Sequence, residues 1–483
     1  MVFSSFEFLL WFLPFCLIVY LLARKKAKNL VLLFFSIVFY AYGAKETPLY
    51  LWLILLSVVI NWICGMLIGR KDGHKKLYLS LGLIWDFGNL FIFKYADFFI
   101  KNINVLPGVN LPLTHLILPL GISFFTFQIA SYLIDVYRGD VKIEYNLIDL
   151  GTYILMFPQL IAGPIVRFSD VQKELHDRTV RRNEFNDGVQ LFIIGLGRKV
   201  LLANTLGGLW TDLQTVGYDS ISTRAAILGI IAYSMQLYFD FSGYSEMAIG
   251  LARMFNLRFP VNFDSPYQSL NIIDFWRRWH MTLGAWVRDY LYIPLGGNRQ
   301  GELRKMFNLL LSMLLIGLWH GAGWTFVIWG GIHGVLLLIN HEWRRLEIQL
   351  PKFLCWGMTF LAVTLAWVFF RAPDSNTALQ IIYTMFDLNA FLLPDCDFTL
   401  AYQDLLASYG IYIKNSWLMA DPHVGDHIVI LLGLLILAVL CPNPVRFMET
   451  FKADKRWLAV AAALFLISLL HMSAYTEFLY FQF

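Results

Sequence analysis

The chain has 483 residues, of which 58% are hydrophobic and 17% aromatic, while only 15% carry a charged side chain. Ordinary soluble proteins are roughly 45 to 50% apolar and about 25% charged, so this composition is typical of an integral membrane protein. It excludes a disordered chain, and the net charge of +4 is too small to indicate nucleic-acid binding. The long apolar runs also exclude a membrane β-barrel, whose strands read as short alternating segments.

The first apolar run covers residues 6–23 and has neither a basic start nor a small-residue cleavage site. We therefore expect a retained membrane helix rather than a signal peptide. Four basic residues follow this run directly, namely Arg24, Lys25, Lys26 and Lys28. Because basic residues beside a span stay in the cytoplasm, this pattern predicts an N-terminus on the outer side of the membrane.

Apolar runs continue along the whole chain. The second covers residues 30–44, the third ends at Arg70, and later ones start near Leu77, Leu116, Leu150, Gly188, Ala225, Met306, Trp324, Phe353, Ile428 and Leu458. At about 20 residues per crossing, they predict an all-α polytopic integral membrane protein with roughly 11 to 13 membrane helices. No linker or repeat divides the chain, so we expect one membrane domain, 1–483.

Two long polar connections differ in charge. Residues 253–305 hold eight Lys or Arg and four acidic residues, which predicts a cytoplasmic connection. Residues 372–426 hold seven Asp and only Lys414 in return, which predicts an acidic loop outside the cell membrane.

Histidine is the natural candidate for acid–base chemistry, because its unperturbed pKa lies near 6.5. Five of the ten histidines fall in polar segments, where we expect a solvated role: His74, His115, His176, His423 and His427. The cysteines have no spacing typical of metal ligands or a redox pair. We therefore expect neither a metal nor a bound cofactor.

His320 stands between two apolar runs, in the sequence GLWHGAGW that starts at Gly317. Glycines around a polar side chain at membrane depth are compatible with a cavity where the histidine meets a substrate. The alternative is a polar contact between two helices, in which the glycines serve only close packing. The local sequence leaves both open.

His280 lies in the sequence DFWRRWHMT, within the basic connection. On a helix, Trp276, Trp279 and His280 would share one face, which predicts an amphipathic helix at the membrane surface. A surface anchor is the favoured interpretation of this stretch alone. His333 follows on the next apolar run, where we expect a supporting or lining role.

Several reaction classes lack their sequence signals. The chain has no G-x-S-x-G elbow, no P-loop lysine motif, no H-E-x-x-H and no G-x-G-x-x-G after a strand. A histidine in a water-poor cavity suits the transfer of an acyl group from a thioester to a hydroxyl, because water would waste the donor. The competing class is a transporter of an acyl carrier or lipid, with the histidines as a proton relay.

Longer stretches carry a resemblance to a known family. They read DFWRRWHMTLGAWVRDYLYIPLGGNR from Asp274, LWHGAGWTFVIWGGIHG from Leu318, FFTFQIASYLIDVYRG from Phe124, FPQLIAGPIVRF from Phe157 and QLYFDFSGYSEMAIG from Gln236. The chain thereby resembles the membrane-bound O-acyltransferase (MBOAT) superfamily. The likeness is to the bacterial branch that contains the membrane subunit of alginate O-acetyltransferase and the membrane protein of teichoic-acid D-alanylation.

The resemblance implies a helical ring around a thinned centre with a tunnel, which a donor enters from the cytoplasm and an acceptor from the far side. It places the catalytic histidine of the W-H-G motif on His320 and the second motif histidine on His280. We expect His320 to act as general base, while His280 orients or polarises the thioester carbonyl.

The expected donor is acetyl-CoA, which would enter and leave as a substrate. Further residues expected to contact the donor or line the tunnel are Arg277, Arg278, Arg288, Trp319, Gly321, Asp240 and Tyr244, although a structural role is equally open for the last two. The arginines would hold the phosphates of the donor.

The resemblance also implies partners. In the alginate-type branch the acetyl group passes to extracytoplasmic SGNH-like proteins that modify a polysaccharide, so we expect such partners and an alginate-type exopolysaccharide acceptor. A multi-pass position among the lipids of the bacterial inner membrane follows, with no nucleic-acid partner. A D-alanyl or peptidoglycan O-acyltransferase of the same fold is the alternative, and a D-alanyl carrier protein would then replace acetyl-CoA.

Overall fold

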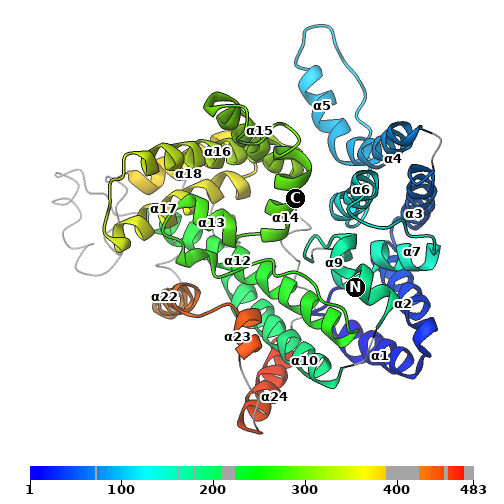
Figure 1. The fold of residues 1–483 in the computed structure, drawn as a ribbon. Coiled ribbons are helices and arrows are strands. Elements are labelled where there is room, and N and C mark those ends of the chain that lie inside the picture. Colours follow the sequence, from blue (N-terminus) through cyan, green and yellow to red (C-terminus); the bar gives the residue numbers. More distant parts are fainter. Residues whose placement is uncertain are drawn as a thin grey trace, which may run out of the picture.

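The computed structural model describes residues 1–70, 73–161, 163–178, 181–207, 223–387, 424–450 and 455–472. Every regular element in these ranges is helical, and no β-strand occurs within them (Figure 1). The predicted all-α fold class is therefore confirmed.

Six described stretches are long and apolar enough to cross a membrane, judged by length and composition. They are Leu49–Ile68, Lys75–Ile103, Arg182–Gly207, Ala225–Met254, Trp324–Arg345 and Lys352–Arg371. A helix of 20 residues is about 30 Å long, which matches the hydrocarbon core of a bilayer. Shorter apolar helices such as Glu7–Leu22 accompany them. The chain is a multi-pass membrane protein, and the total of 11 to 13 crossings stays a prediction.

The first helices of the chain form one side of the molecule, blue to cyan in Figure 1. They are η1 (Glu7–Phe12), α1 (Leu13–Leu22), η2 (Lys25–Ala27), α2 (Lys28–Gly43), α3 (Leu49–Ile68), α4 (Lys75–Leu90), η3 (Phe91–Tyr95), α5 (Ala96–Ile103), α6 (Ile122–Arg138) and α7 (Leu147–Leu155). Helix α4 packs against both α3 and α6. The buried Asn61 and Asp86 join α3 to α4 through a hydrogen bond of 2.8 Å.

A central pair of helices follows the short helices α8 (Phe157–Leu160) and α9 (Phe168–His176). It consists of α10 (Arg182–Gly197), with its continuation η4 (Arg198–Ala203), and the long helix α12 (Thr223–Met254). Two buried ion pairs tie η4 to α12, Lys199 with Asp240 and Arg198 with Glu246. A buried charge needs a partner because its desolvation is costly, so these pairs hold the two helices in one register.

The later helices form the opposite side of the molecule, green to yellow in Figure 1, and α12 contacts α17 and α18 of this group as well as the earlier α8. They are η6 (Pro266–Gln268), α13 (Ile272–Arg278), α14 (Met281–Val287), η7 (Arg288–Tyr292), α15 (Glu302–His320), α16 (Trp324–Arg345), α17 (Lys352–Arg371) and α18 (Ser375–Phe386). The last described helices are α22 (Val424–Leu440), α23 (Pro444–Thr450) and α24 (Lys455–Leu470), of which α24 packs on α10.

Two predicted segments differ in the structure. The apolar run from Leu150 forms no single crossing, because it breaks into the nine-residue α7 and the four-residue α8. Pro158 is the second residue of α8, a position at a helix start that tolerates proline. The expected acidic loop 372–426 contains α18, and its residues 388–423 lie outside the described residues. The sides assigned to the two polar connections stay predictions.

Candidate active site

His320 ends helix α15 and is only 5% exposed. Its imidazole lies against the ring of Trp319 at 5.0 Å and against those of Trp329 and Phe370 at 5.2 Å, measured between ring centroids. These side chains come from α15, α16 and α17. The histidine is therefore enclosed by aromatic rings at the point where three helices meet.

Glycines bring α15 and α16 into close contact beside this histidine. A Cβ atom on Gly317 would lie 2.2 Å from the carbonyl oxygen of Phe326, and one on Gly330 would lie 2.3 Å from that of Met313. Both positions exclude any side chain, since each would collide with backbone. A Cβ on Gly321 would meet the ring of Phe326 at 2.2 Å. Of the two interpretations of these glycines, close helix packing is the one that the geometry supports.

His280 lies at a break between two short helices. Helix α13 ends at Arg278, and His280 has φ 44° and ψ 51°, a left-handed conformation that costs a residue other than glycine free energy. The break is held by backbone hydrogen bonds from the preceding loop: Asp264 N–H donates to Arg278, and Met281 N–H donates to Asn262.

The prediction of an amphipathic surface helix across this segment is therefore wrong. Trp279 and His280 follow the end of α13 instead of continuing it, and they are 2% and 0% exposed. The physical reason is the loop from Asn262 to Asp264, which takes the backbone groups that a continuous helix would use for itself.

One side chain determines which nitrogen of His280 carries the proton. Oδ1 of Asn262 accepts hydrogen bonds from the hydroxyl of Thr282 at 2.8 Å and from its backbone N–H at 3.4 Å. The same oxygen lies 3.0 Å from Nδ1 of His280. Because this oxygen only accepts, Nδ1 must donate. The lone pair of the neutral ring is then on Nε2, which is buried and has no hydrogen-bond partner among the described residues.

His280 lies outside the six candidate spans, and burial lowers its pKa to about 3. Its ring is therefore neutral near pH 7. A neutral ring with its proton on Nδ1 can accept a hydrogen bond at Nε2 but cannot donate one there. This tautomer does not fit the expected polarisation of a thioester carbonyl by His280 and fits a role in orienting a hydroxyl.

The two motif histidines lie close together in the buried interior. Their ring centroids are 6.4 Å apart, so their nitrogens are too distant for a direct hydrogen bond. His333 of α16 lies beside them, and its Nδ1 accepts a hydrogen bond of 3.3 Å from Nε1 of Trp276. We call His280, His320 and His333 together the histidine layer. Trp329 packs between His320 and His333, and its indole N–H is buried without a hydrogen-bond partner in the described ranges.

A lysine from the other side of the molecule reaches the end of α15. Nζ of Lys94 donates to the carbonyl oxygens of Trp319 at 2.6 Å and of His320 at 3.1 Å, and to the hydroxyl of Ser123 at 3.2 Å. Carbonyls at a helix C-terminus have no partner within the helix, and the helix dipole favours a cation there. Lys94 thus fixes the backbone that carries His320.

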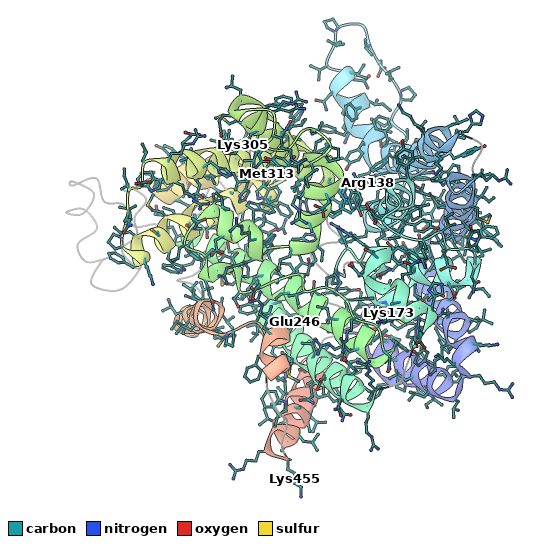
Figure 2. All side chains as sticks on the ribbon, viewed as in Figure 1. Arg138, Lys173, Glu246, Lys305, Met313 and Lys455 are labelled. Carbon is teal, nitrogen blue, oxygen red and sulfur yellow. The ribbon has the colours of Figure 1, made fainter. Side chains whose placement is uncertain are left out.

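A cavity of about 570 Å³ adjoins the histidine layer. It is bounded by α13, α14, η7, α15 and α16, and its lining includes Trp276, Arg277, Met281, Arg288, Met313 and His341. Met313, which belongs to α15, is labelled in Figure 2. Met281 follows His280 directly, and Trp276 contacts His333, so the cavity borders the layer itself. Its volume is in the range of small-molecule sites.

The expected donor-binding arginines divide into two kinds. Arg277 and Arg288 line the cavity, and Arg288 also pairs with Asp289. Arg278 instead pairs with Asp274 at 3.0 Å and donates to the carbonyl oxygen of Asp264 at 3.3 Å. Arg278 therefore stabilises the break between α13 and α14.

The remaining predicted residues lie in packing positions. Trp319 stacks on Phe127 of α6 with 5.2 Å between the ring centroids, and Gly321 faces Phe326. On α12, Asp240 pairs with Lys199, and Tyr244 stacks on Phe3 at 4.5 Å. The structural role left open for Asp240 and Tyr244 is the one these contacts support, and the predicted donor contacts of Trp319 and Gly321 stay predictions.

Sequence reasoning missed three residues of this site. Lys94 had a usable signal, because an ionisable side chain within an apolar run indicates a function or a bundle contact. Asn262 and Trp329 stand in family-like stretches, FPVNFDSPY from Phe259 and LWHGAGWTFVIWGGIHG from Leu318, but an asparagine in a polar loop and a tryptophan in an apolar run do not by themselves indicate a role.

The comparison with known proteins gives one family. The model of MBOAT, the membrane-bound O-acyltransferase family, matches residues 50–373. The chain is 43% identical over 406 residues to "Probable alginate O-acetylase AlgI" of Pseudomonas aeruginosa, which covers 82% of this chain and 76% of the relative. It is 35% identical over 529 residues to the peptidoglycan O-acetyltransferase of Helicobacter pylori, and the match covers 100% of this chain and 98% of the relative. A teichoic acid D-alanyltransferase of Bacillus subtilis is 28% identical over 319 residues, and the match covers 62% of this chain and 77% of the relative.

Proposed function

The chain belongs to the membrane-bound O-acyltransferase family, and we propose that it transfers an acetyl group from acetyl-CoA toward hydroxyls of an extracytoplasmic polysaccharide. The observation that carries this proposal is the pair of buried histidines with ring centroids 6.4 Å apart, beside a cavity lined by Arg277 and Arg288. Acyl transfer itself follows from the family. The donor and the acceptor are the proposed part.

His320 takes the proton of the attacking hydroxyl in this proposal. The hydroxyl oxygen then bonds to the thioester carbonyl carbon, the carbon–sulfur bond breaks with its electron pair going to sulfur, and the sulfur takes the proton back from His320 to leave as the thiol of CoA. General-base assistance of this kind contributes about 10² to 10⁴-fold to the rate. The aromatic rings around His320 exclude water, which would otherwise hydrolyse the thioester.

His280 and Trp329 have complementary roles. Nε2 of His280 offers a lone pair, so it holds a hydroxyl of the acceptor in place. The indole N–H of Trp329 is a donor without a hydrogen-bond partner in the described part of the chain, next to the ring of His320. It stabilises the oxyanion that forms on the thioester oxygen.

The cavity supports acetyl-CoA as the donor. Its apolar walls suit an extended pantetheine arm, and the guanidinium groups of Arg277 and Arg288 suit phosphate groups. Both arginines are exposed at the cavity, as binding to a soluble nucleotide requires. A D-alanyl carrier protein, the donor that the teichoic-acid relatives suggest, would need a docking surface instead of these phosphate contacts.

The acceptor and the location follow from the relatives and the charge pattern. Relatives named for alginate O-acetylation support an alginate-type polysaccharide, with extracytoplasmic partner proteins that complete the modification. The basic residues after the first helix support a position in the bacterial inner membrane with the N-terminus outside. A second candidate acceptor is peptidoglycan, because the relative named for that reaction aligns over the whole chain.

The test uses the full chain purified into lipid nanodiscs, with acetyl-CoA labelled in the acetyl group. We expect release of free CoA that depends on added acceptor, with label moving to mannuronate oligosaccharides when the extracytoplasmic partner proteins are supplied. Labelling of peptidoglycan fragments alone would select the second acceptor. If neither acceptor causes release of CoA, and the protein instead transfers D-alanine from a charged carrier protein, the proposed donor is wrong. Passage of acetyl-CoA across the membrane without cleavage would indicate a transporter.

A further inference from the structure

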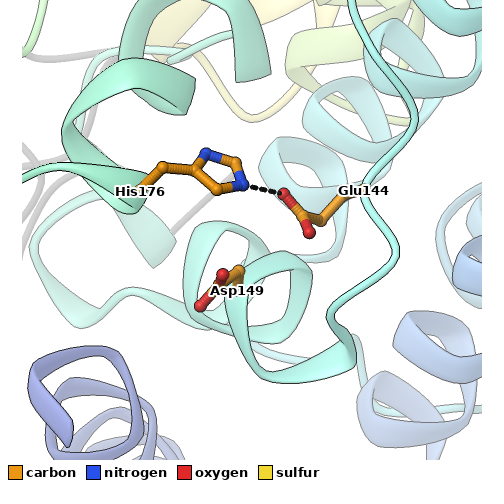
Figure 3. Close-up of side chains that lie close together, drawn as sticks. All are labelled: Glu144, Asp149 and His176. Carbon is orange, nitrogen blue, oxygen red and sulfur yellow. Dashed lines mark ion pairs between the residues drawn. The ribbon is translucent and has the colours of Figure 1, made fainter. Parts of the chain in front are cut away.

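Three side chains that could bind a metal meet beside α7 and α9, and none belongs to the active site described above. Glu144 precedes α7, Asp149 lies in its first turn, and His176 is the last residue of α9 (Figure 3). One ligand atom from each lies within 4.8 Å of the others. His176 was expected in a solvated segment, whereas the fold directs it at two carboxylates that are distant in sequence.

The orientation of His176 is fixed by its second nitrogen. Nδ1 lies 2.7 Å from the carbonyl oxygen of Gln172, one helical turn earlier, so Nδ1 donates its proton there. In the neutral ring, Nε2 then carries a lone pair. Nε2 is 2.9 Å from Oε2 of Glu144, so this nitrogen either carries a second proton, as in an ion pair, or shares a cation with the carboxylate.

The carboxylates are held in the same manner. Glu144 is 4% exposed, and its Oε1 accepts a hydrogen bond of 2.9 Å from the backbone N–H of Asn146. Oδ1 of Asp149 accepts from the side-chain amide of Asn29 at 2.5 Å. Metal ligands in proteins are commonly oriented in this way, by a hydrogen bond at the atom that does not bind the ion.

The charges also favour a divalent ion. Two carboxylates bring two negative charges, and a protonated His176 would offset only one of them. A divalent ion offsets both and satisfies all three ligand atoms. One imidazole nitrogen and two carboxylate oxygens suit first-row metals such as zinc.

We propose that Glu144, Asp149 and His176 bind one first-row divalent cation, with zinc as the fitting representative and water completing the coordination. Ligands on tetrahedral zinc are about 3.3 Å apart, so Nε2 of His176 and Oε2 of Glu144, now at 2.9 Å, would separate slightly, and Asp149 would approach them by up to about 1.5 Å. His176 is half-exposed, which gives both the ion and its water access to the site.

The bound ion would fasten α9 to the start of α7. The opposite end of α9 is fixed by Arg167, which forms an ion pair of 2.8 Å with Asp289. Asp289 also pairs with Arg288 of the donor cavity. The ion would thus hold one end of the helix whose other end supports the cavity wall.

The experiment measures zinc binding by isothermal titration calorimetry on the full chain, purified in detergent and stripped with a chelator. We expect one equivalent of zinc per chain at micromolar concentration. His176→Ala should weaken this binding at least about tenfold, and Glu144→Gln should do the same while keeping the hydrogen bond from Asn146.

The control variant is His471→Ala. Nδ1 of His471 makes the same kind of bond, 2.9 Å to the carbonyl oxygen of Ile467, yet His471 belongs to no group of three potential ligands among the described residues. Its loss should leave the titration unchanged. If the parent protein binds no zinc, or if His176→Ala and Glu144→Gln bind it like the parent, the cluster is only a histidine–glutamate ion pair and the proposal fails. This readout is independent of acyl transfer.

Discussion

At the scale of single residues, Asn262 determines which ring nitrogen of His280 carries the proton. Its side-chain oxygen accepts from Nδ1 of His280 and twice from Thr282, and this leaves Nε2 of the histidine as an acceptor. The backbone of His280 is left-handed, so the position pays a conformational cost to hold that orientation. A histidine fixed this firmly fits a role in positioning a reacting group.

Changing Asn262→Asp should make transfer sensitive to acid. A carboxylate still accepts from Nδ1, but its negative charge favours the protonated ring and raises the pKa of His280 above its present value of about 3. A protonated ring has no lone pair on Nε2. We therefore expect kcat to fall as pH drops from 8 to 5 in the variant, beyond any fall in the parent. Identical pH profiles of the two proteins would contradict the assigned role.

Trp329→Phe removes one indole N–H and keeps an aromatic ring beside His320. If this group stabilises the oxyanion, kcat should fall about 10² to 10³-fold with little change in KM for the donor. Trp343→Phe, on the exposed part of the same helix, is the matched control and should have normal kinetics. A Trp329→Phe variant with normal kcat would exclude the indole from the reaction.

At the scale of elements, the site depends on how closely α15 and α16 approach. Gly317 and Gly330 lie at the crossing, and each has backbone of the other helix where its side chain would be. This contact places the end of α15, with His320, against Trp329 of α16. Local helix packing therefore sets the shape of the histidine layer.

Gly330→Ala should destabilise the protein. Its new methyl group would stand 2.3 Å from the carbonyl oxygen of Met313, and relieving such overpacking costs about 1 to 3 kcal/mol. The measurement is thermal unfolding in detergent, with Gly357→Ala on α17 as control, because a Cβ there has no atom within 4 Å. Equal melting temperatures for the two variants would show that the crossing is not tight.

The sequence predicted helices well where apolar runs are long and less well where short helices meet. Periodicity alone extended one helix through His280, because Trp276, Trp279 and His280 have helical spacing. The helix ends before Trp279 because Asp264 and Met281 form backbone hydrogen bonds across the break, and such bonds between distant segments leave no local signal. The two motif histidines were predicted from the family resemblance, whereas Asn262 became evident only from its contacts.

On the scale of the whole molecule, Lys94 joins the two sides of the fold. It belongs to η3 in the first group of helices, and it donates to the last carbonyls of α15 in the second. The catalytic backbone is thus fixed by a residue more than two hundred positions away in the chain. Relative placement of the two groups and the position of His320 are therefore coupled.

Lys94→Met should keep the shape of the side chain but lose all three hydrogen bonds. Because small misplacements of a catalytic group cost up to about 10²-fold in rate, we expect a lower kcat and a nearly unchanged KM for the donor. Lys101→Met, on the exposed face of α5, is the control. Normal kcat in Lys94→Met would show that the C-terminal end of α15 keeps its position without the hydrogen bonds of the lysine.

The central claim is that His320 is the base for acyl transfer, and its most direct test is the turnover of a His320→Ala variant in nanodiscs. The account predicts that acceptor-dependent release of CoA falls about 10² to 10⁴-fold, while the protein unfolds at a temperature close to that of the parent. His471→Ala, at an exposed histidine, should turn over like the parent. A folded His320→Ala protein that transfers the acetyl group at the parental rate would contradict the account.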